Sequence, residues 1–211
     1  MNNKYELTDE TRTINGVTLR RIRALRDIQR FDVKAGELGG WIESENNLSQ
    51  SGDAWVYGNA EVSGNAEVSG NAKVYGNAKV YGDAEVYGNA KVYGDAWVYG
   101  DAEVYGNAKV CGDAWVYGNA KVYGNAEVYG NAKVYGNADY MTFKNSWSSG
   151  RWFTYTRSNK MWSVGCFYGT GEKLIRKAYA DSELSGKCYE AIVRAVEAIE
   201  AAKAKAKGET K

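Results

Sequence analysis

Histidine and proline are both absent from this 211-residue sequence. Without an imidazole, the chain lacks the commonest general base, the commonest metal ligand and every Ser-His or Cys-His nucleophile pair. We therefore predict no catalytic residues and no enzyme activity. Glutamates at 67, 85 and 103 recur at one spacing. Carboxylates stacked along one face converge poorly on an ion, so we predict no metal site, calcium included.

Cysteine is scarce, and long apolar runs are missing. Cys111, Cys166 and Cys188 form an odd set at unrelated spacings, which favours neither a disulfide framework nor a zinc site. No stretch is apolar over the length that a membrane-spanning helix needs, and residues 1–6 lack the apolar core of a signal peptide. We expect a cytoplasmic protein that does not contact a membrane.

Glycine and aromatic residues are abundant instead, with 25 Gly, 17 Tyr and 7 Trp. This composition is typical of a repetitive β architecture. From Gly52 to Ala138 a six-residue phrase, Gly-Asn/Asp-Ala-x-Val-x, repeats in unbroken register, with a glycine at every sixth position from 52 to 136. Such a fixed period predicts a solenoid.

Each phrase reads as one short strand and one corner. The segment Ala-x-Val-x has the two-residue period of a strand with one buried face, so alanine and valine point inward. Glycine tolerates positive φ, and Asn or Asp side chains bond nearby amides, as a sharp corner requires. Strands this short cannot bury their apolar side alone, so successive phrases must coil and stack.

The phrase resembles the hexapeptide repeat of left-handed parallel β-helices, in which three phrases form one triangular coil. The resemblance implies left-handedness and about five coils. We therefore expect an all-β solenoid with an N-terminal β-hairpin cap and a small C-terminal α+β cap. The expected units are residues 1–40, 41–139 and 140–211.

With three phrases in a coil, residues eighteen apart form ladders on three faces. The outward position after alanine gives Trp55, Lys73, Lys91, Lys109 and Glu127; Glu61, Lys79, Trp97, Trp115 and Lys133; and Glu67, Glu85, Glu103, Lys121 and Asp139. The next outward position is nearly always tyrosine. We predict an interaction surface formed by Trp97, Trp115, Tyr81, Tyr99 and Tyr117, although stacked rings can equally serve to stabilise the coil.

Charge is segregated along the chain. Basic and acidic residues number 8 and 6 in residues 1–40, 6 and 13 in residues 41–139, and 13 and 7 in residues 140–211. Basic ends can meet an anionic partner or the acidic body of a second copy, or they can simply be solvated. At the N-terminus, residues 5–14 and 17–28 flank Asn15-Gly16, a strong hairpin signal.

A more specific resemblance lies at the start of the coil. The stretches 31–36 (FDVKAG), 39–42 (GGWI), 47–50 (NLSQ) and 52–53 (GD) are similar to the N-terminal signature of YdcK-like hexapeptide-repeat proteins of bacteria and their phages. That family is labelled transferase by analogy of fold. The resemblance covers roughly the first 140 residues.

After Ala138 the composition changes, and three strands followed by two helices are expected. Gly169-Thr170-Gly171 opens a helix whose free amides can bind an anion. Arg151, Arg157 and Lys160 can add positive charge, while Trp152, Trp162 and Tyr168 can add stacking surfaces. We predict an anion or nucleotide site formed by these residues together with Thr170. The alternative is a packed aromatic mini-core with solvated basic turns.

Three functions compete at this point. The first is a non-catalytic structural or protein-interaction solenoid, encoded by a phage or prophage, that binds a protein partner or itself. The alternative is a ligand binder that uses the C-terminal cap to sequester a nucleotide or inhibit host defence. Acyl transfer, which the fold resemblance implies through a catalytic histidine and coenzyme A, is not expected because the chain has no histidine. We predict no cofactor and no nucleic-acid partner.

Overall fold

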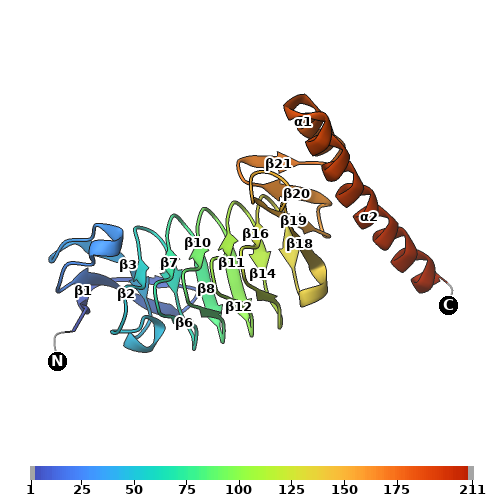
Figure 1. The fold of residues 1–211 in the computed structure, drawn as a ribbon. Coiled ribbons are helices and arrows are strands. Elements are labelled where there is room, and N and C mark those ends of the chain that lie inside the picture. The colour runs from blue at the N-terminus through green and yellow to red at the C-terminus, as the bar shows by residue number, and fades with distance from the viewer. Residues whose placement is uncertain (1–2, 209–211) are drawn as a thin grey trace.

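The hexapeptide phrases coil into a β-solenoid of about five turns, with a hairpin at one end and a small sheet with two helices at the other (Figure 1). The computed structural model describes residues 3–208. The predicted solenoid with its two flanking caps is confirmed. Its left-handedness stays an expectation from the resemblance.

Three parallel sheets form the faces of the solenoid. One face is β4 (Trp55–Val56), β7 (Lys73–Val74), β10 (Lys91–Val92), β13 (Lys109–Val110) and β16 (Glu127–Val128). The second is β3 (Leu38–Ile42), β5 (Glu61–Val62), β8 (Lys79–Gly82), β11 (Trp97–Gly100), β14 (Trp115–Val116) and β17 (Lys133–Val134). The third is β6 (Glu67–Val68), β9 (Glu85–Val86), β12 (Glu103–Val104) and β15 (Lys121–Val122). From β4 onward, strand partners lie eighteen residues apart, as in Trp97 and Trp115, so the predicted ladders form.

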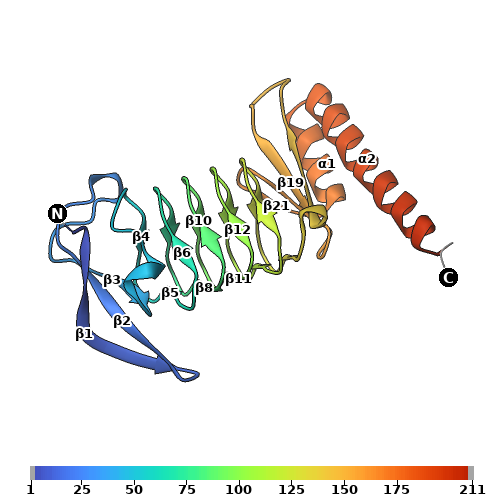
Figure 2. The ribbon, with the colours of Figure 1, turned by 90° about the horizontal axis from the view of Figure 1, so that it is seen from below.

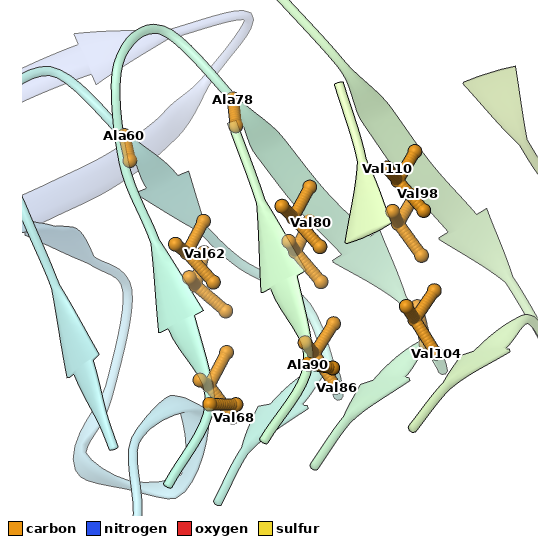
Figure 3. Packing of buried hydrophobic residues seen from close by; sticks show 14 of the residues in the cluster. Ala60, Val62, Val68, Ala78, Val80, Val86, Ala90, Val98, Val104 and Val110 are labelled. Carbon is orange, nitrogen blue, oxygen red and sulfur yellow. The ribbon is translucent and has the colours of Figure 1, made fainter. Parts of the chain in front are cut away.

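Alanine and valine fill the solenoid from within. The valines from Val56 to Val134 and the alanines from Ala54 to Ala132 in the repeated phrases are fully buried. Figure 3 shows their side chains pointing into the space between the faces, stacked on one another from coil to coil. Because the interior is narrow, these positions hold the small side chains of alanine and valine.

The corner glycines from Gly52 to Gly130 have a positive φ, which suits glycine and disfavours other residues. At most corners it also lies against the glycine of the next coil. A Cβ added to Gly94, for example, would lie 3.0 Å from the backbone nitrogen of Gly112.

Hydrogen bonds between coils repeat at fixed positions of the phrase. The amide of the outward residue after alanine donates to the alanine carbonyl of the following coil, as Trp55 does to Ala72 and Lys109 to Ala126. At the first coil, inward carbonyls such as those of Leu48 and Ala54 therefore lack a donor from an earlier coil, and at the last coil the outward-residue amides lack an acceptor from a later one. Buried groups of this kind need other partners.

Donor side chains cover the first coil. The hairpin β1 (Tyr5–Ile14) and β2 (Val17–Ala24) turns at Asn15 and Gly16, as predicted, and pairs with β3. The predicted boundary at residue 40 thus falls inside a strand shared by hairpin and solenoid. Just before β1, the Lys4 ammonium donates to the Ala54 carbonyl at 2.8 Å, while the Tyr5 hydroxyl donates to the Leu48 carbonyl at 2.6 Å.

Two outward positions differ from the expected ladders. Trp55 was expected on an exposed face, but it is buried because the Tyr5 ring packs edge-on against it. Asp139 was expected in the third ladder, but it lies in the short 3-10 helix η3 (Asn137–Asp139). Its carboxylate accepts hydrogen bonds from the Tyr135 and Gly136 amides. Both departures occur where the caps meet the coil.

Acceptor side chains cover the last coil. The amides of Lys121, Glu127 and Lys133 donate to Asn137, Thr154 and Ser158 side-chain oxygens. Thr154 and Ser158 belong to the antiparallel sheet of β18 (Tyr140–Lys144), β19 (Trp152–Thr156), β20 (Met161–Val164) and β21 (Phe167–Gly169) and its turns. Helices α1 (Gly171–Asp181) and α2 (Glu183–Gly208) pack on this sheet, and α2 runs past its edge (Figure 1).

We predict that Gly94→Ala destabilises the solenoid more than Gly124→Ala. Both glycines have positive φ, but a Cβ at Gly124 would meet nothing within 4 Å. Gly124→Ala should therefore lower the unfolding free energy by about 1 kcal/mol through backbone strain alone. Gly94→Ala should cost at least about twice as much, because the methyl also displaces the next coil. Equal losses in denaturant unfolding would show that coil contact at the corners is unimportant.

We also predict a stability change linked to Lys4. Burial and, secondarily, Arg26 lower the pKa of its ammonium to about 8. Between about pH 8 and the ordinary lysine pKa, the unfolded chain binds the proton more tightly than the folded chain, so the unfolding free energy should rise with pH. We expect a gain of about 2 kcal/mol from pH 7.5 to 9.5. In Lys4→Met this gain should disappear; a variant that keeps it would exclude Lys4 as its source.

Candidate functional site

A basic groove runs along the face of β7, β10 and β13. It has a volume of about 720 Å³, and its walls are residues 29–32, Asn71, Lys73, Asn89, Lys91, Asn107 and Lys109. Residues 29–31 form the 3-10 helix η1 (Gln29–Phe31), which joins the hairpin to the solenoid. The groove therefore combines a repeated wall with one segment that lies outside the repeat.

Lysines occupy three successive rungs of this groove. Lys91 is the direct strand partner of both Lys73 and Lys109. Neighbouring strands lie about 4.8 Å apart, so the three side chains start from closely spaced points. Lys109 forms an ion pair with Glu127 at 2.6 Å, whereas neither Lys73 nor Lys91 pairs with a carboxylate in residues 3–208. Stacked like charges without counter-charges are unfavourable in a sheet.

Aromatic rings and an arginine surround the lysine ladder near Lys73 and Lys91. The Lys73 ammonium lies 4.3 Å from the centre of the Tyr57 ring and 5.3 Å from that of Phe31. Burial and, to a smaller extent, Lys91 lower the pKa of Lys73. Arg30 donates to the Asn89 amide oxygen at 2.9 Å and adds a further positive charge beside the ladder.

Side-chain amides line the corner next to the lysines. Asn71 donates to Asn89, and Asn89 donates to Asn107, so the amides form a hydrogen-bonded row along the coils. Each amide nitrogen has a second hydrogen that this row does not use. The groove thus offers positive charge and neutral donors over several rungs, which is a suitable environment for phosphate groups.

The sequence analysis noted the lysine ladder but did not predict the groove. Lys73, Lys91 and Lys109 could be assigned to one face from their spacing of eighteen residues. Arg30 and Phe31 could not, because nothing in their local sequence places η1 beside β7 and β10. The short basic run before the repeat was the one available signal.

The predicted interaction surface forms on the face of β8, β11 and β14. Trp97 and Trp115 stack with ring centres 5.2 Å apart, and Tyr81, Tyr99 and Tyr117 stack at 4.9 and 5.2 Å. The ring planes within each stack are nearly parallel. Ring faces are therefore used between neighbouring coils, and ring edges point outward. This geometry supports the stabilising role; binding of a partner at these five residues stays a prediction.

The residues of the predicted C-terminal site do not line one cavity. Trp162 is buried in the core of the cap. Arg157 makes a two-pronged ion pair with Glu200 of α2, and Thr170 caps α1 by accepting from the Lys173 amide. These three side chains serve the fold of the cap.

The other four predicted residues lie apart from one another. Tyr168 packs edge-on against Tyr129 of the last coil. Lys160 lines a hollow of about 260 Å³ together with Trp162 and two glutamates of α2, and Arg151 lines a different, smaller one of about 20 Å³. Trp152 faces Lys144. The carboxylates beside Lys160 disfavour an anion there, so a ligand role for this set stays a prediction without a common cavity.

Within residues 3–208, no three Cys, Asp or Glu side chains cluster in a way that could hold a metal ion. In the same part of the chain, neither helix combines the length and the apolar character needed to cross a membrane.

No family model matches the chain. Among curated proteins, the chain is 42% identical over 62 residues to "Uncharacterized acetyltransferase YdcK" of Escherichia coli (strain K12). The match covers 26% of this chain and 18% of YdcK. Together with the solenoid, this match fits the predicted YdcK-like hexapeptide-repeat protein.

This relative is named as an acetyltransferase, which contradicts our prediction that the chain is not an enzyme. That prediction depended on the missing histidine. A missing residue type excludes the mechanisms that use it, but acyl transfer can use other proton acceptors, such as a lysine amine or a carboxylate. The prediction of no enzyme activity, and with it the exclusion of acyl transfer, was wrong.

Proposed function

We propose that this YdcK-like hexapeptide-repeat protein binds a phosphate-bearing acetyl donor in the basic groove and transfers the acetyl group. The observation that carries the proposal is the lysine ladder: Lys73 and Lys91 stack directly, and neither has a carboxylate partner within residues 3–208. A bound polyanion would remove the repulsion between them. Ligand binding should therefore be favourable at this face in particular.

Acetyl-coenzyme A is the acetyl donor with the required charge, because it carries several phosphates on an elongated frame and leaves as free coenzyme A after transfer. In the groove, Arg30, Lys91 and Lys109 can bind phosphate oxygens, and the Asn89 amide can donate a further hydrogen bond. Phe31 and Tyr57 offer apolar surface at the end of the ladder. When bound, the donor would supply an acyl thioester, which a nucleophile can attack.

The groove also contains a candidate proton acceptor. The lowered pKa of Lys73 increases the fraction of its Nζ that is neutral near pH 7. A neutral amine can accept the proton that the attacking acceptor molecule loses, which is the role a histidine fills elsewhere. Lys73 is therefore the first residue to test for an effect on turnover beyond its effect on binding.

We predict that acetyl-coenzyme A and coenzyme A bind the purified protein and that Lys91→Gln weakens both by about tenfold. Isothermal titration measures the affinity, and release of free thiol measures turnover. The matched control is Lys133→Gln, which removes a lysine at the same position of the phrase on another face. It should leave the affinity unchanged.

The outcomes separate binding from transfer. Binding that Lys91→Gln weakens and Lys133→Gln does not, together with thiol release that Lys73→Gln abolishes, would support the whole proposal. The same binding without thiol release in the presence of amine and hydroxyl acceptors would leave the groove as a binding site and refute transfer. No binding of either compound at millimolar concentration would refute both parts.

A second candidate function, self-association, is favoured by the exposed apolar side chains of α2. Leu184 is 60% exposed and Ile199 is 42% exposed, on the helix that runs past the cap (Figure 1). Large apolar side chains on a projecting helix are commonly covered by a partner. A second copy of the chain is the simplest partner, because its basic C-terminal part can also meet the acidic body of a neighbour.

For this candidate we predict a defined oligomer in native mass spectrometry. Ile199→Ser together with Leu184→Ser should convert it to a monomer without changing the melting temperature of the solenoid, since both side chains lie outside the cores. The control Lys187→Ser changes a residue of α2 whose ion pair stays within the helix. A wild-type monomer at micromolar concentration would exclude this function.

A further inference from the structure

The tyrosine ladder on the face of β5, β8, β11 and β14 begins abruptly. Tyr81, Tyr99 and Tyr117 stack on one another, but one coil before Tyr81 the equivalent position holds Ser63. A serine side chain is too small to cover a phenol ring. The face of Tyr81 that points away from Tyr99 therefore has no ring against it in the described chain.

The hairpin encloses the space below this ring. A slot of about 270 Å³ lies between the solenoid and the hairpin, and its lining includes Ser63, Tyr81 and Trp97 on one side and Ile14, Val17 and Leu19 on the other. We call it the ring slot. Figure 2 shows the hairpin leaving the end of the solenoid, with its tip beside the coils. The slot is thus largely apolar and open on one side.

We propose that the ring slot binds an uncharged, planar nitrogen heterocycle of the nucleobase class, which continues the tyrosine stack by one rung. Aromatic rings at this spacing attract one another, and the ladder above shows the favoured offset, near 5 Å between centres. The slot is large enough for one such ring system. Its apolar hairpin wall would cover the second face of the ring.

The charges at the rim favour a neutral ligand. Glu61 accepts from Arg12 at 2.9 Å and pairs with Lys79 at 3.3 Å, so the carboxylate is already surrounded by positive charge. The Lys79 ammonium also lies 5.6 Å from the Trp97 ring centre. A charged ligand would compete with these contacts, whereas a neutral ring would leave them intact.

The polar groups at the slot favour a ring with heteroatoms at its edge. Asn15, at the hairpin turn, offers both an amide donor and an amide acceptor. The Ser63 hydroxyl makes no hydrogen bond to any residue from 3 to 208 that would have to be broken. A purely hydrocarbon ring would leave both groups unpaired.

The other tyrosine ladders lack this arrangement. Below Tyr75, the Lys73 ammonium lies between the Tyr75 and Tyr57 rings. Below Tyr87, the equivalent position is Ser69, but the hairpin continues the sheet of the other face and does not extend that of β6 and β9. Only the ladder that starts at Tyr81 combines a free ring face with an apolar wall among the described residues.

The test uses adenosine, which is uncharged and so avoids the basic groove. We predict that adenosine binds the intact protein in an NMR titration, with nuclear Overhauser contacts from its base protons to the Ile14 and Leu19 methyl groups. Ser63→Tyr places a protein ring in the slot and should weaken binding at least tenfold. Because it extends the stack, this variant should melt at the same temperature as the unchanged protein or higher.

Ser69→Tyr is the matched control, since it makes the same substitution at the start of a neighbouring ladder. It should leave adenosine binding unchanged. Adenosine binding that survives Ser63→Tyr, or base protons without contacts to Ile14 and Leu19, would overturn the proposal even if one variant failed to fold. Binding of indole but not of adenosine would also overturn it, because the slot would then select an aromatic side chain.

Discussion

The hydrogen-bonding groups left over at the two ends of the solenoid govern the architecture. The outward residue after each alanine donates its amide to the following coil, so inward carbonyls are left over at the first coil and outward-residue amides at the last. Donor side chains satisfy the carbonyls at the first coil, and acceptor side chains satisfy the amides at the last coil. Lys4, Tyr5 and Arg26 donate at the start, and Asn137, Thr154 and Ser158 accept at the end. A bare sheet edge would invite another chain, so the caps also limit uncontrolled end-to-end growth.

The same repetition that builds the core determines the chemistry of the surface. Residues eighteen apart must lie side by side, so any outward residue type that repeats becomes a row. Where opposite charges are neighbours, as in Lys121 and Glu103 at 2.6 Å, they form an ion pair within the row. Where they do not, as in Lys73 and Lys91, the row has a net attraction for an external anion. Tyrosine rows have the opposite property, because each ring covers its neighbours and only the rings at the ends of a row keep an uncovered face.

Sequence reasoning succeeded where the structure follows from the repeat and failed where segments outside the repeat fold back on it. The inward alanines and valines, the strand register and the Asn15-Gly16 turn all follow from local pattern. The burial of Trp55 beneath Tyr5 and the position of Arg30 over the lysine ladder depend on how the first 36 residues pack, which no period encodes. In the cap, Arg157 and Trp162 are residue types typical of a ligand site. The structure instead places Arg157 in an ion pair with Glu200 and buries Trp162 in the core. The argument against enzyme activity failed for another reason: it treated one missing side chain as if it were the whole of acyl-transfer chemistry.

The rigidity of the solenoid makes its two proposed sites separable. The basic groove lies on the face of β7, β10 and β13, and the ring slot lies on the face that the hairpin extends. Between the faces, the valine and alanine layers are fully buried and have no room to shift. Binding at one site therefore has no ready structural route to the other, and affinities measured at the two should be independent. The hairpin and η1 belong to one continuous N-terminal segment, however, and each forms one wall of a site. Any coupling between the sites must therefore pass through residues 14–31 rather than through the repeats.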